Sequence, residues 1–357
     1  MPATRTAPTL TAGGPLPSLT GMRWLAAFTV FLYHVKNFGY LGGPPGRFAD
    51  WAFTPGMTGV SFFFILSGFV LAWSARPGDR PGLFWRRRLA RVYPLHLVTA
   101  LAALALAFSL LPRLRPSGPP EALANLLLVN TWYRPWWQAL NPLSWSLTCE
   151  AFFYAAFPLI YLALRRPGPR AVAAVAVGAA LTVIILPVGY SLAGLGWDTP
   201  SSFPPARLPE FVLGVALGRL LQTTVWRGPG LKASMAITLA GYVLTGYVPG
   251  EYTFAACTVL GMALLIPAAA AADLNGTPSV WRRPLMVRLG ELSFAFYLVH
   301  LLLMRVGERL FGGHPQLGFL PGMGVTAMAF TTCLAMAWAL HEAVERPGRR
   351  WIMPRSR

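Results

Sequence analysis

Long apolar segments follow one another along almost the whole of this 357-residue chain. A helix that crosses a bilayer needs about 20 predominantly apolar residues, and by this criterion the sequence predicts about ten spans. We therefore expect an all-α, polytopic integral membrane protein. The stretch Glu121–Trp132 is too short to cross a bilayer and predicts an interfacial or re-entrant helix. The predicted spans cover residues 19–39, 56–74, 89–112, 143–164, 170–190, 206–222, 232–249, 252–273, 289–310 and 319–342.

The composition excludes an ordinary soluble domain. Apolar residues make up 55% of the chain and charged residues 12%, with a mean hydropathy of +0.51, whereas soluble domains carry about 25% charged residues. The net charge of +18 would suggest a nucleic-acid partner if the protein were soluble. Here, however, the Arg and Lys residues stand mainly between apolar segments, so we expect a lipid bilayer around the protein and no nucleic acid.

The distribution of Arg and Lys predicts the orientation of the chain. Alternate connections place 21 of these residues on one side of the membrane and seven on the other. Because cytoplasmic connections carry the excess of positive charge, we expect both termini in the cytoplasm of a bacterial cell, with the protein crossing its cytoplasmic membrane repeatedly. The expected organisation is a disordered cytoplasmic tail at 1–16, a transmembrane core at 17–345 and a basic cytoplasmic tail at 346–357.

The three cysteines give no sign of a disulfide or metal framework. Cys149, Cys257 and Cys333 all lie within apolar segments, with no CxxC or Cys/His spacing. This pattern argues against a disulfide scaffold and a zinc site, and we expect no metal cofactor.

Arg23 and His34 lie eleven residues apart in the first predicted span. In an α-helix this spacing makes about three turns, so both side chains occupy one face, roughly 16 Å apart along the axis. A buried histidine is often a packing residue, but ionisable groups within a membrane span are costly and are by default functional. A neutral imidazole, with an ordinary pKa near 6.5, could take a proton from an attacking hydroxyl.

A cluster of arginines precedes the predicted span at 89–112. It comprises Arg86, Arg87, Arg88 and Arg91, and anchoring on the cytoplasmic side explains part of it. Arg88 and Arg91 are three residues apart and share a helix face. Because paired guanidinium groups match phosphate oxygens bidentately, this pair suits the phosphorylated head of a coenzyme.

Two further blocks place polar groups inside predicted spans. Glu150, in the segment Pro142–Tyr154, should pair with an arginine, orient His34 or meet substrate, although a purely structural ion pair remains an alternative. The segment Leu289–His300 adds a carboxylate, a serine, a tyrosine and a histidine.

The predicted extracytoplasmic connection between residues 113 and 141 is rich in aromatic residues. They are Trp132, Tyr133, Trp136 and Trp137. Such residues form belts at the lipid interface, but Trp faces also suit sugar rings and other apolar ligand surfaces. The sequence leaves both interpretations open.

Taken in order, these blocks resemble the membrane-bound acyltransferase family 3. The family's opening Arg and His, separated by ten residues, correspond to Arg23 and His34. One departure is Ser61, where the family often has an acidic residue. The remaining blocks are GVSFFFILSGF at 59–69, RLARVYP at 88–94, WSLTCE at 145–150, SFAFYLVH at 293–300 and ERP at 345–347.

The resemblance implies an O-acyltransferase that uses acyl-CoA from the cytoplasm, with acetyl-CoA or another short-chain acyl-CoA as co-substrate. His34 would be the general base, and Arg23 would bind the pantetheine arm or stabilise developing negative charge. Glu150 would orient the imidazole or bind the acceptor. Arg88 and Arg91, with Arg86 and Arg87, would hold the coenzyme phosphates. Substrate binding is expected from Trp145, Tyr154, Tyr297 and His300.

The resemblance leaves the hydroxyl-bearing acceptor open between a small molecule and a glycan. The opening LPSLTGMR at 16–23 is similar to actinobacterial members that act on macrolides or their sugars, and a cell-envelope polysaccharide or glycolipid is the alternative. We expect any activity to come from the membrane core, because the chain lacks the hydrolase-like domain of longer relatives. A non-catalytic transporter or flippase, with Arg23, His34 and Glu150 along a substrate path, is an alternative of another class.

Overall fold

The computed structural model describes residues 13–76, 78–194, 200–248, 250 and 255–353. Over these residues the chain is helical, and its one β-type pairing is an isolated bridge between Leu41 and Leu317. This confirms the expected all-α class. Residues 1–12 of the predicted N-terminal tail and 354–357 of the basic tail lie outside the described residues, so the domain boundaries stay predictions.

The longer helices coincide with the predicted spans. α5 and the 3₁₀ turn Asn130–Trp132 occupy the stretch predicted as an interfacial or re-entrant helix, and α2 was not anticipated from the sequence. The helices are α1 Pro17–Asn37, α2 Gly43–Phe53, α3 Thr58–Ser74, α4 Pro81–Ser109, α5 Pro119–Leu126, α6 Trp145–Arg165, α7 Pro169–Leu192, α8 Pro204–Thr223, α9 Leu231–Thr245, α10 Val259–Leu274, α11 Pro284–Phe311, α12 Phe319–Leu340 and α13 Arg346–Ile352.

Within the described part of the chain, six helical stretches are long and apolar enough to cross a membrane. α9 and α10 are shorter apolar helices, and α1 and α8 fall outside this criterion. Both carry buried or half-buried polar groups, Arg23 and His34 on α1 and Arg207 and Glu210 on α8, which lower their hydropathy. The structure therefore supports a multi-pass membrane protein, whereas the total number of spans and the orientation stay predictions.

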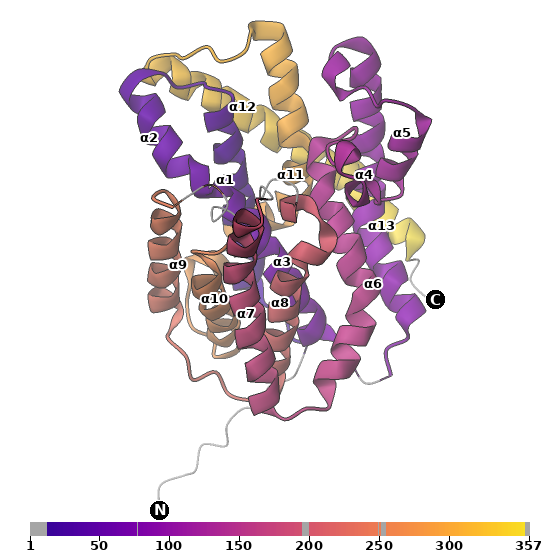
Figure 1. Cartoon of the computed structure of the whole chain (residues 1–357), viewed down its shortest axis with the longest axis vertical. Helices are drawn as coiled ribbons and strands as arrows, with labels where there is room; N and C mark the ends of the chain where they lie inside the picture. The colour runs from indigo at the N-terminus through magenta and orange to yellow at the C-terminus, as the bar shows by residue number, and fades with distance from the viewer. Residues whose placement is uncertain (1–12, 77, 195–199, 249, 251–254, 354–357) are drawn as a thin grey trace, which may run out of the picture.

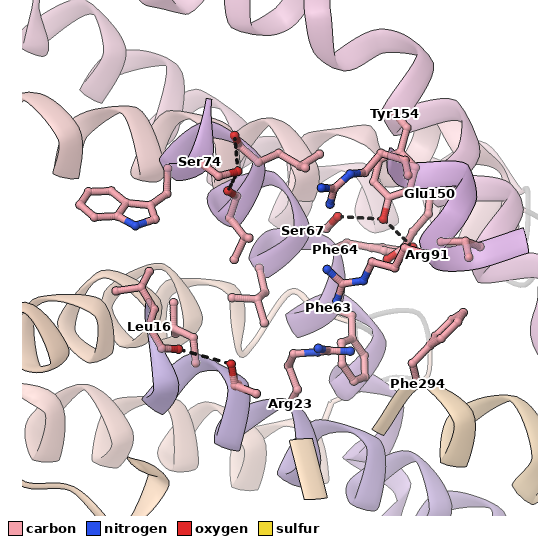
Figure 2. A pocket seen from close by; sticks show the side chains of 18 of the residues that line it. Leu16, Arg23, Phe63, Phe64, Ser67, Ser74, Arg91, Glu150, Tyr154 and Phe294 are labelled. Carbon is pink, nitrogen blue, oxygen red and sulfur yellow. Dashed lines mark hydrogen bonds between the residues drawn. The ribbon is translucent and has the colours of Figure 1, made fainter. Parts of the chain in front are cut away.

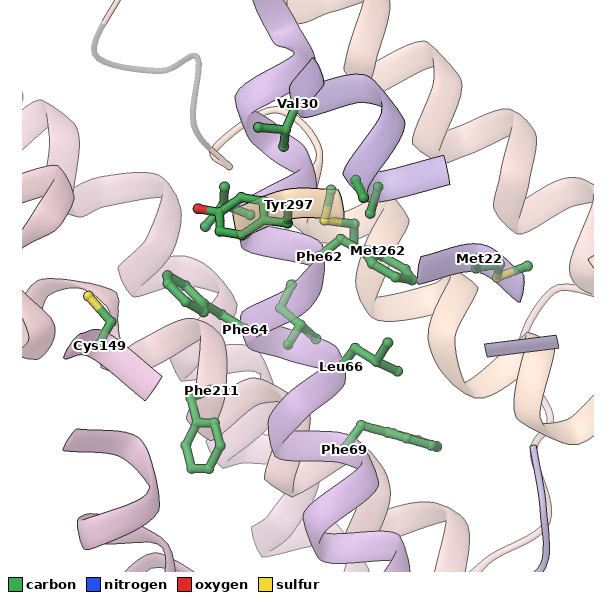
Figure 3. Close-up of a cluster of buried hydrophobic side chains, with 14 of the residues drawn as sticks. Met22, Val30, Phe62, Phe64, Leu66, Phe69, Cys149, Phe211, Met262 and Tyr297 are labelled. Atoms are coloured by element: carbon green, nitrogen blue, oxygen red, sulfur yellow. The ribbon is translucent and has the colours of Figure 1, made fainter. Parts of the chain in front are cut away.

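α3 lies at the centre of the helical bundle. Figure 1 shows α4, α6 and α13 on one side and α9 and α10 on the other, with α3 and α8 between them. Apolar side chains of α3 pack against Phe211 of α8, Met262 of α10 and Tyr297 of α11 (Figure 3). The core thus joins four helices that are far apart in the sequence.

Glycines bring α3 and α8 into close contact. A Cβ added at Gly68 would meet the carbonyl of Phe211, and one added at Gly214 would meet the carbonyl of Ile65. Gly218, one turn further along α8, faces α3 in the same way. Because lipid supplies no hydrophobic drive between helices, close backbone packing at small residues is a main source of helix association in membranes.

The start of α1 is fixed to the end of α10. The backbone N–H of Ser18 donates to Asp273 Oδ2 at 2.8 Å, and its hydroxyl donates to Oδ1 at 2.7 Å. Arg282 lies 3.5 Å from the same carboxylate. Gly21 and Gly290 allow α1 and the α11 region to approach each other closely. These contacts set the position of the helix that carries both Arg23 and His34.

Candidate active site

A first cavity, of about 360 Å³, lies between α1, α3, α4, α6 and α11. We call it the arginine cavity because Arg23, Arg88 and Arg91 line it, together with Glu150 and Tyr154. Figure 2 shows Arg23 and Arg91 directed into this space from different helices. The structure therefore gathers in one place the paired arginines of α4 and the first arginine of α1.

Positive charge exceeds negative charge in the arginine cavity. Among the described residues, none of its three arginines has a carboxylate within ion-pair distance, and the Nε atom of Arg88 is buried without a hydrogen-bond partner. Glu150 accepts a hydrogen bond from Tyr154 at 2.9 Å. Since a guanidinium group at this depth is costly to leave unpaired, the cavity is suited to an anionic ligand with several oxygen atoms.

The other two arginines of the α4 cluster are directed elsewhere. Arg86 donates from Nε to the carbonyl of Ile352 at 2.8 Å and thereby ties α4 to α13. Arg87 is exposed, and neither residue lines the arginine cavity. Of the four arginines predicted to hold phosphate, the structure brings Arg88 and Arg91 together around the cavity.

A second cavity, of about 500 Å³, lies toward the other end of α1. We call it the histidine cavity because His34 lines it; Trp137, Trp145 and Arg305 contribute from other parts of the chain. The Nε2 atom of His34 is buried and has no hydrogen-bond partner among the described residues. Further lining residues include Asn37, Gln138, Ser201, Ser202 and Glu308.

His300 lies beside His34. The centres of the two rings are 5.2 Å apart, and His300 is fully buried. Its Nδ1 atom is 3.2 Å from the carbonyl oxygen of Phe296. Because a carbonyl oxygen only accepts, this contact places the proton of the neutral ring on Nδ1 and leaves Nε2 as an acceptor.

The two cavities approach each other near the middle of the bundle. Trp145 lines the histidine cavity, whereas Ser146, the next residue, lines the arginine cavity. On α11, Tyr297 lines the arginine cavity and Leu301, about one turn further, lines the histidine cavity. The hydroxyl groups of Ser146 and Tyr297 are 2.9 Å apart and form a hydrogen bond between α6 and α11. Neighbouring residues of α6 and α11 thus line the two spaces.

The structure distributes the remaining predicted site residues between the cavities. Tyr154 and Tyr297 belong to the arginine cavity and Trp145 to the histidine cavity. Glu150 lines the cavity that does not include His34, and the contact described for its carboxylate is with Tyr154.

The aromatic residues of the connection between residues 113 and 141 lie in different surroundings. Trp137 lines the histidine cavity, whereas Trp132 packs against Phe152 and Phe203 and is 49% exposed. Of these two residues, Trp137 thus lies at a cavity.

Sequence reasoning missed several residues that line the cavities. Ser67 and Ser146 stand inside motifs that resemble the family, which was the available signal for them. Arg305 was counted only as a charge near a span end, and nothing in its local sequence distinguishes it. Over the described residues, no group of three or more His, Cys, Asp or Glu side chains could hold a metal ion.

Comparison with known proteins agrees with the motifs. The acyltransferase domain family matches residues 16–340. Acyltransferase MdmB of Streptomyces mycarofaciens is 42% identical over 94% of this chain and 92% of its own length. Nodulation protein 10 of Rhizobium leguminosarum bv. viciae is 27% identical over 92% of each chain. O-acetyltransferase OatA of Staphylococcus aureus is 30% identical over 43% of this chain and 26% of its own.

No solved structure matches the chain. The family match nevertheless covers nearly all of the helical bundle, including the two cavities and the helices that form them. From the ordered motifs, the membrane-type helices and the full-length likeness to MdmB, we conclude that this chain belongs to the acyltransferase family 3 and is a membrane acyltransferase.

Proposed function

We propose that the protein transfers an acyl group from acyl-CoA to a hydroxyl of a macrolide or of its sugar, with His34 as the general base. The observation that carries this proposal is the Nε2 atom of His34, which has no hydrogen-bond partner among the described residues. It lies in a cavity that shares α1, α6 and α11 with a second cavity rich in arginine. The two spaces suit the two substrates of such a transfer.

The arginine cavity is the proposed site of the donor. Arg88 and Arg91 hold phosphate oxygens of the coenzyme, and Arg23 contacts the pantetheine arm or a further phosphate. Charge-assisted hydrogen bonds of this kind are the strong ones, and Arg forks match phosphate geometry. By the predicted orientation this cavity faces the cytoplasm, where acyl-CoA is present.

We assign Glu150 to the donor site and not to orienting the imidazole of His34. Its carboxylate accepts from Tyr154 and lies in the arginine cavity, so we assign it to holding this tyrosine and to accepting a hydrogen bond from the donor. Tyr297 and Ser146 stand where the pantetheine arm would pass toward the histidine cavity. An acetyl or other short acyl group would then reach His34.

The histidine cavity is the proposed site of the acceptor. It combines an aromatic face, Trp137, with neutral polar side chains such as Asn37 and Gln138. Aromatic rings with a few placed hydrogen-bonding groups suit a glycosylated small molecule. His34 would remove the hydroxyl proton, and His300, held by its contact with Phe296, would keep the imidazole in place.

The full-length likeness to an acyltransferase of Streptomyces supports a small-molecule acceptor. A second candidate, O-acylation of a cell-envelope polysaccharide or glycolipid, is favoured by one observation. The histidine cavity lies toward the end of α1 away from the arginine-rich side. By the predicted orientation, this end faces out of the cytoplasm, where such an acceptor would be met.

The proposal is tested with purified protein in detergent, supplied with acetyl-CoA and a panel of macrolides, their sugars and envelope glycans. We expect acceptor-dependent release of free coenzyme A, together with an acylated product. Release of coenzyme A with envelope glycans but not with macrolides or their sugars would favour the second candidate, O-acylation of a polysaccharide or glycolipid. If the protein neither binds nor consumes acyl-CoA with any acceptor, the enzymatic assignment is wrong and a transporter or flippase becomes the leading interpretation.

A further inference from the structure

Arg305 lies in the histidine cavity, on α11, five residues beyond His300. Within the described residues it is the one arginine that lines this cavity. Its position in a helix long and apolar enough to cross a membrane makes a charged side chain costly. Its location in the cavity that His34 lines, rather than in a connection, is unexpected for a residue that serves only orientation in the membrane.

Within the described residues, the guanidinium group of Arg305 has no ion-pair partner, and Glu308 acts on its charge from beyond ion-pair distance. Its Nε atom is buried and has no hydrogen-bond partner in the described part of the chain. Glu308 lines the same cavity, but the ion pairs found among the described residues do not include this pair. A buried donor without a hydrogen-bond partner is unfavourable, so this nitrogen is suited to a partner that is absent from the resting protein.

The resemblance implies that Arg23 binds the pantetheine arm or stabilises developing negative charge, and it lies too far from His34 for the second of these roles. The two residues are eleven positions apart on one helix, α1, which corresponds to roughly 16 Å along its axis. They also line different cavities. If the proton is taken at His34, the negative charge develops in the histidine cavity, where Arg305 is the available guanidinium.

We propose that Arg305 is a catalytic residue that stabilises the oxyanion of the acyl-transfer intermediate; this inference rests on the proposed function. The acceptor hydroxyl oxygen bonds to the thioester carbonyl carbon while His34 takes the hydroxyl proton. The electron pair of the C=O double bond moves to oxygen, and Arg305 donates hydrogen bonds to this oxyanion. When the double bond re-forms, the C–S bond breaks and the departing thiolate takes the proton from the imidazolium. Acyl-CoA and alcohol thus become ester and coenzyme A.

Two other roles would satisfy the same geometry and are distinguished by kinetics. Arg305 could bind an anionic group of the acceptor in the ground state, which would change KM for the acceptor and leave kcat unaltered. It could also act as a structural counter-charge for Glu308, which would change stability and coenzyme binding together with activity. An oxyanion donor, by contrast, acts in the transition state, so its loss lowers kcat.

The experiment compares Arg305→Gln, Arg305→Lys and Arg305→Ala with Arg309→Gln, a matched control one turn further along α11. Arg309 is exposed and lines neither cavity. For each variant we would measure kcat, KM for both substrates and the dissociation constant of coenzyme A, which reports on the intact arginine cavity. Activity of Arg305→Ala would also be measured with added guanidinium chloride, at concentrations that leave the wild type unaffected.

We expect Arg305→Gln to lower kcat by on the order of 100-fold, the usual loss for one oxyanion donor, with coenzyme binding unchanged. Arg305→Lys should retain part of the activity, guanidinium should restore part of it to Arg305→Ala, and Arg309→Gln should match wild type. A rise in KM for the acceptor at constant kcat, or unchanged kinetics in Arg305→Gln, would overturn the inference. The proposed function would still stand as long as the wild-type protein transferred the acyl group. Absence of turnover in the wild type would reject the proposed function itself.

Discussion

Arg23 and His34 project from a single helix into two separate cavities. Their spacing of eleven residues places Arg23 among the arginines of α4 and His34 beside His300 and Trp137. In this arrangement, one helix contributes both to the proposed donor site and to the proposed site of proton transfer. Binding and chemistry should therefore be separable by mutation.

Loss of an arginine from the arginine cavity should weaken coenzyme binding. Arg91→Gln removes a guanidinium that lines the arginine cavity and has no carboxylate within ion-pair distance among the described residues. Charge-assisted hydrogen bonds contribute about 1.5–3 kcal/mol. We expect the dissociation constant of coenzyme A to rise by about 10- to 100-fold, measured by isothermal titration calorimetry. Arg87→Gln, exposed on the same helix, is the control, and an equal loss in both variants would contradict the assignment of the cavity.

Trp137 should contribute to binding of the acceptor and not to binding of the donor. Its ring lines the histidine cavity, and an aromatic contact contributes about 0.5–1.5 kcal/mol beyond the area that it buries. We expect Trp137→Ala to raise KM for the acceptor by roughly 3- to 10-fold or more, with coenzyme binding unchanged, in steady-state kinetics. Trp132→Ala, from the same aromatic connection but outside both cavities, should leave KM near that of wild type; equal effects would indicate a general loss of packing.

Gly214 should not tolerate a side chain. Its would-be Cβ meets the carbonyl of Ile65 on α3, and overpacking typically costs about 1–3 kcal/mol. We expect Gly214→Ala to lower the melting temperature in detergent. Gly178→Ala, on α7, is the matched control. A Cβ added at Gly178 meets no other atom, and alanine is more favourable than glycine in a helix by about 1 kcal/mol, so this variant should not be destabilised. A Gly214→Ala protein as stable as wild type would contradict the close packing of α3 and α8.

Asp273 should be required for the stability of the start of α1. Asp273→Ala removes both acceptors of Ser18 and leaves its buried N–H without a partner, at a cost of about 1–3 kcal/mol. We expect a lower melting temperature, with a smaller effect for Asp273→Asn, which retains an acceptor oxygen. Ser279→Ala, which removes one contact of the Ser18 hydroxyl, provides the control. Unchanged stability in Asp273→Ala would show that this contact does not hold α1.

The local features of the site could be predicted from the sequence. Helical spacing placed Arg88 and Arg91 on one face, and both line the arginine cavity. The depth of His34 in an apolar span predicted a functional imidazole; its Nε2 atom has no hydrogen-bond partner in the described part of the chain, and the function of the imidazole stays a prediction. Each of these expectations depends on the spacing of residues along a single helix, which can be read from the sequence.

The assignment of residues to cavities could not be predicted in the same way. Glu150 was expected to pair with an arginine, orient His34 or meet substrate, and the sequence could not show that α6 places it in the arginine cavity, against Tyr154. The sequence could not place Arg305 in a cavity with His34, because the other residues that line this cavity come largely from distant segments of the chain. Which side chains share a space depends on how α1, α6 and α11 pack, and glycine contacts far from the site determine part of that packing.

The most direct test of two separate substrate sites is a comparison of coenzyme binding and acyl transfer in His34→Ala. We expect this variant to bind coenzyme A with the affinity of the wild type, because the arginine cavity does not include His34, and to lose acceptor-dependent release of coenzyme A by at least about 100-fold. His314→Asn, at an exposed position, should match wild type in both measurements. Retention of transfer in His34→Ala, or loss of coenzyme binding together with transfer, would contradict the account.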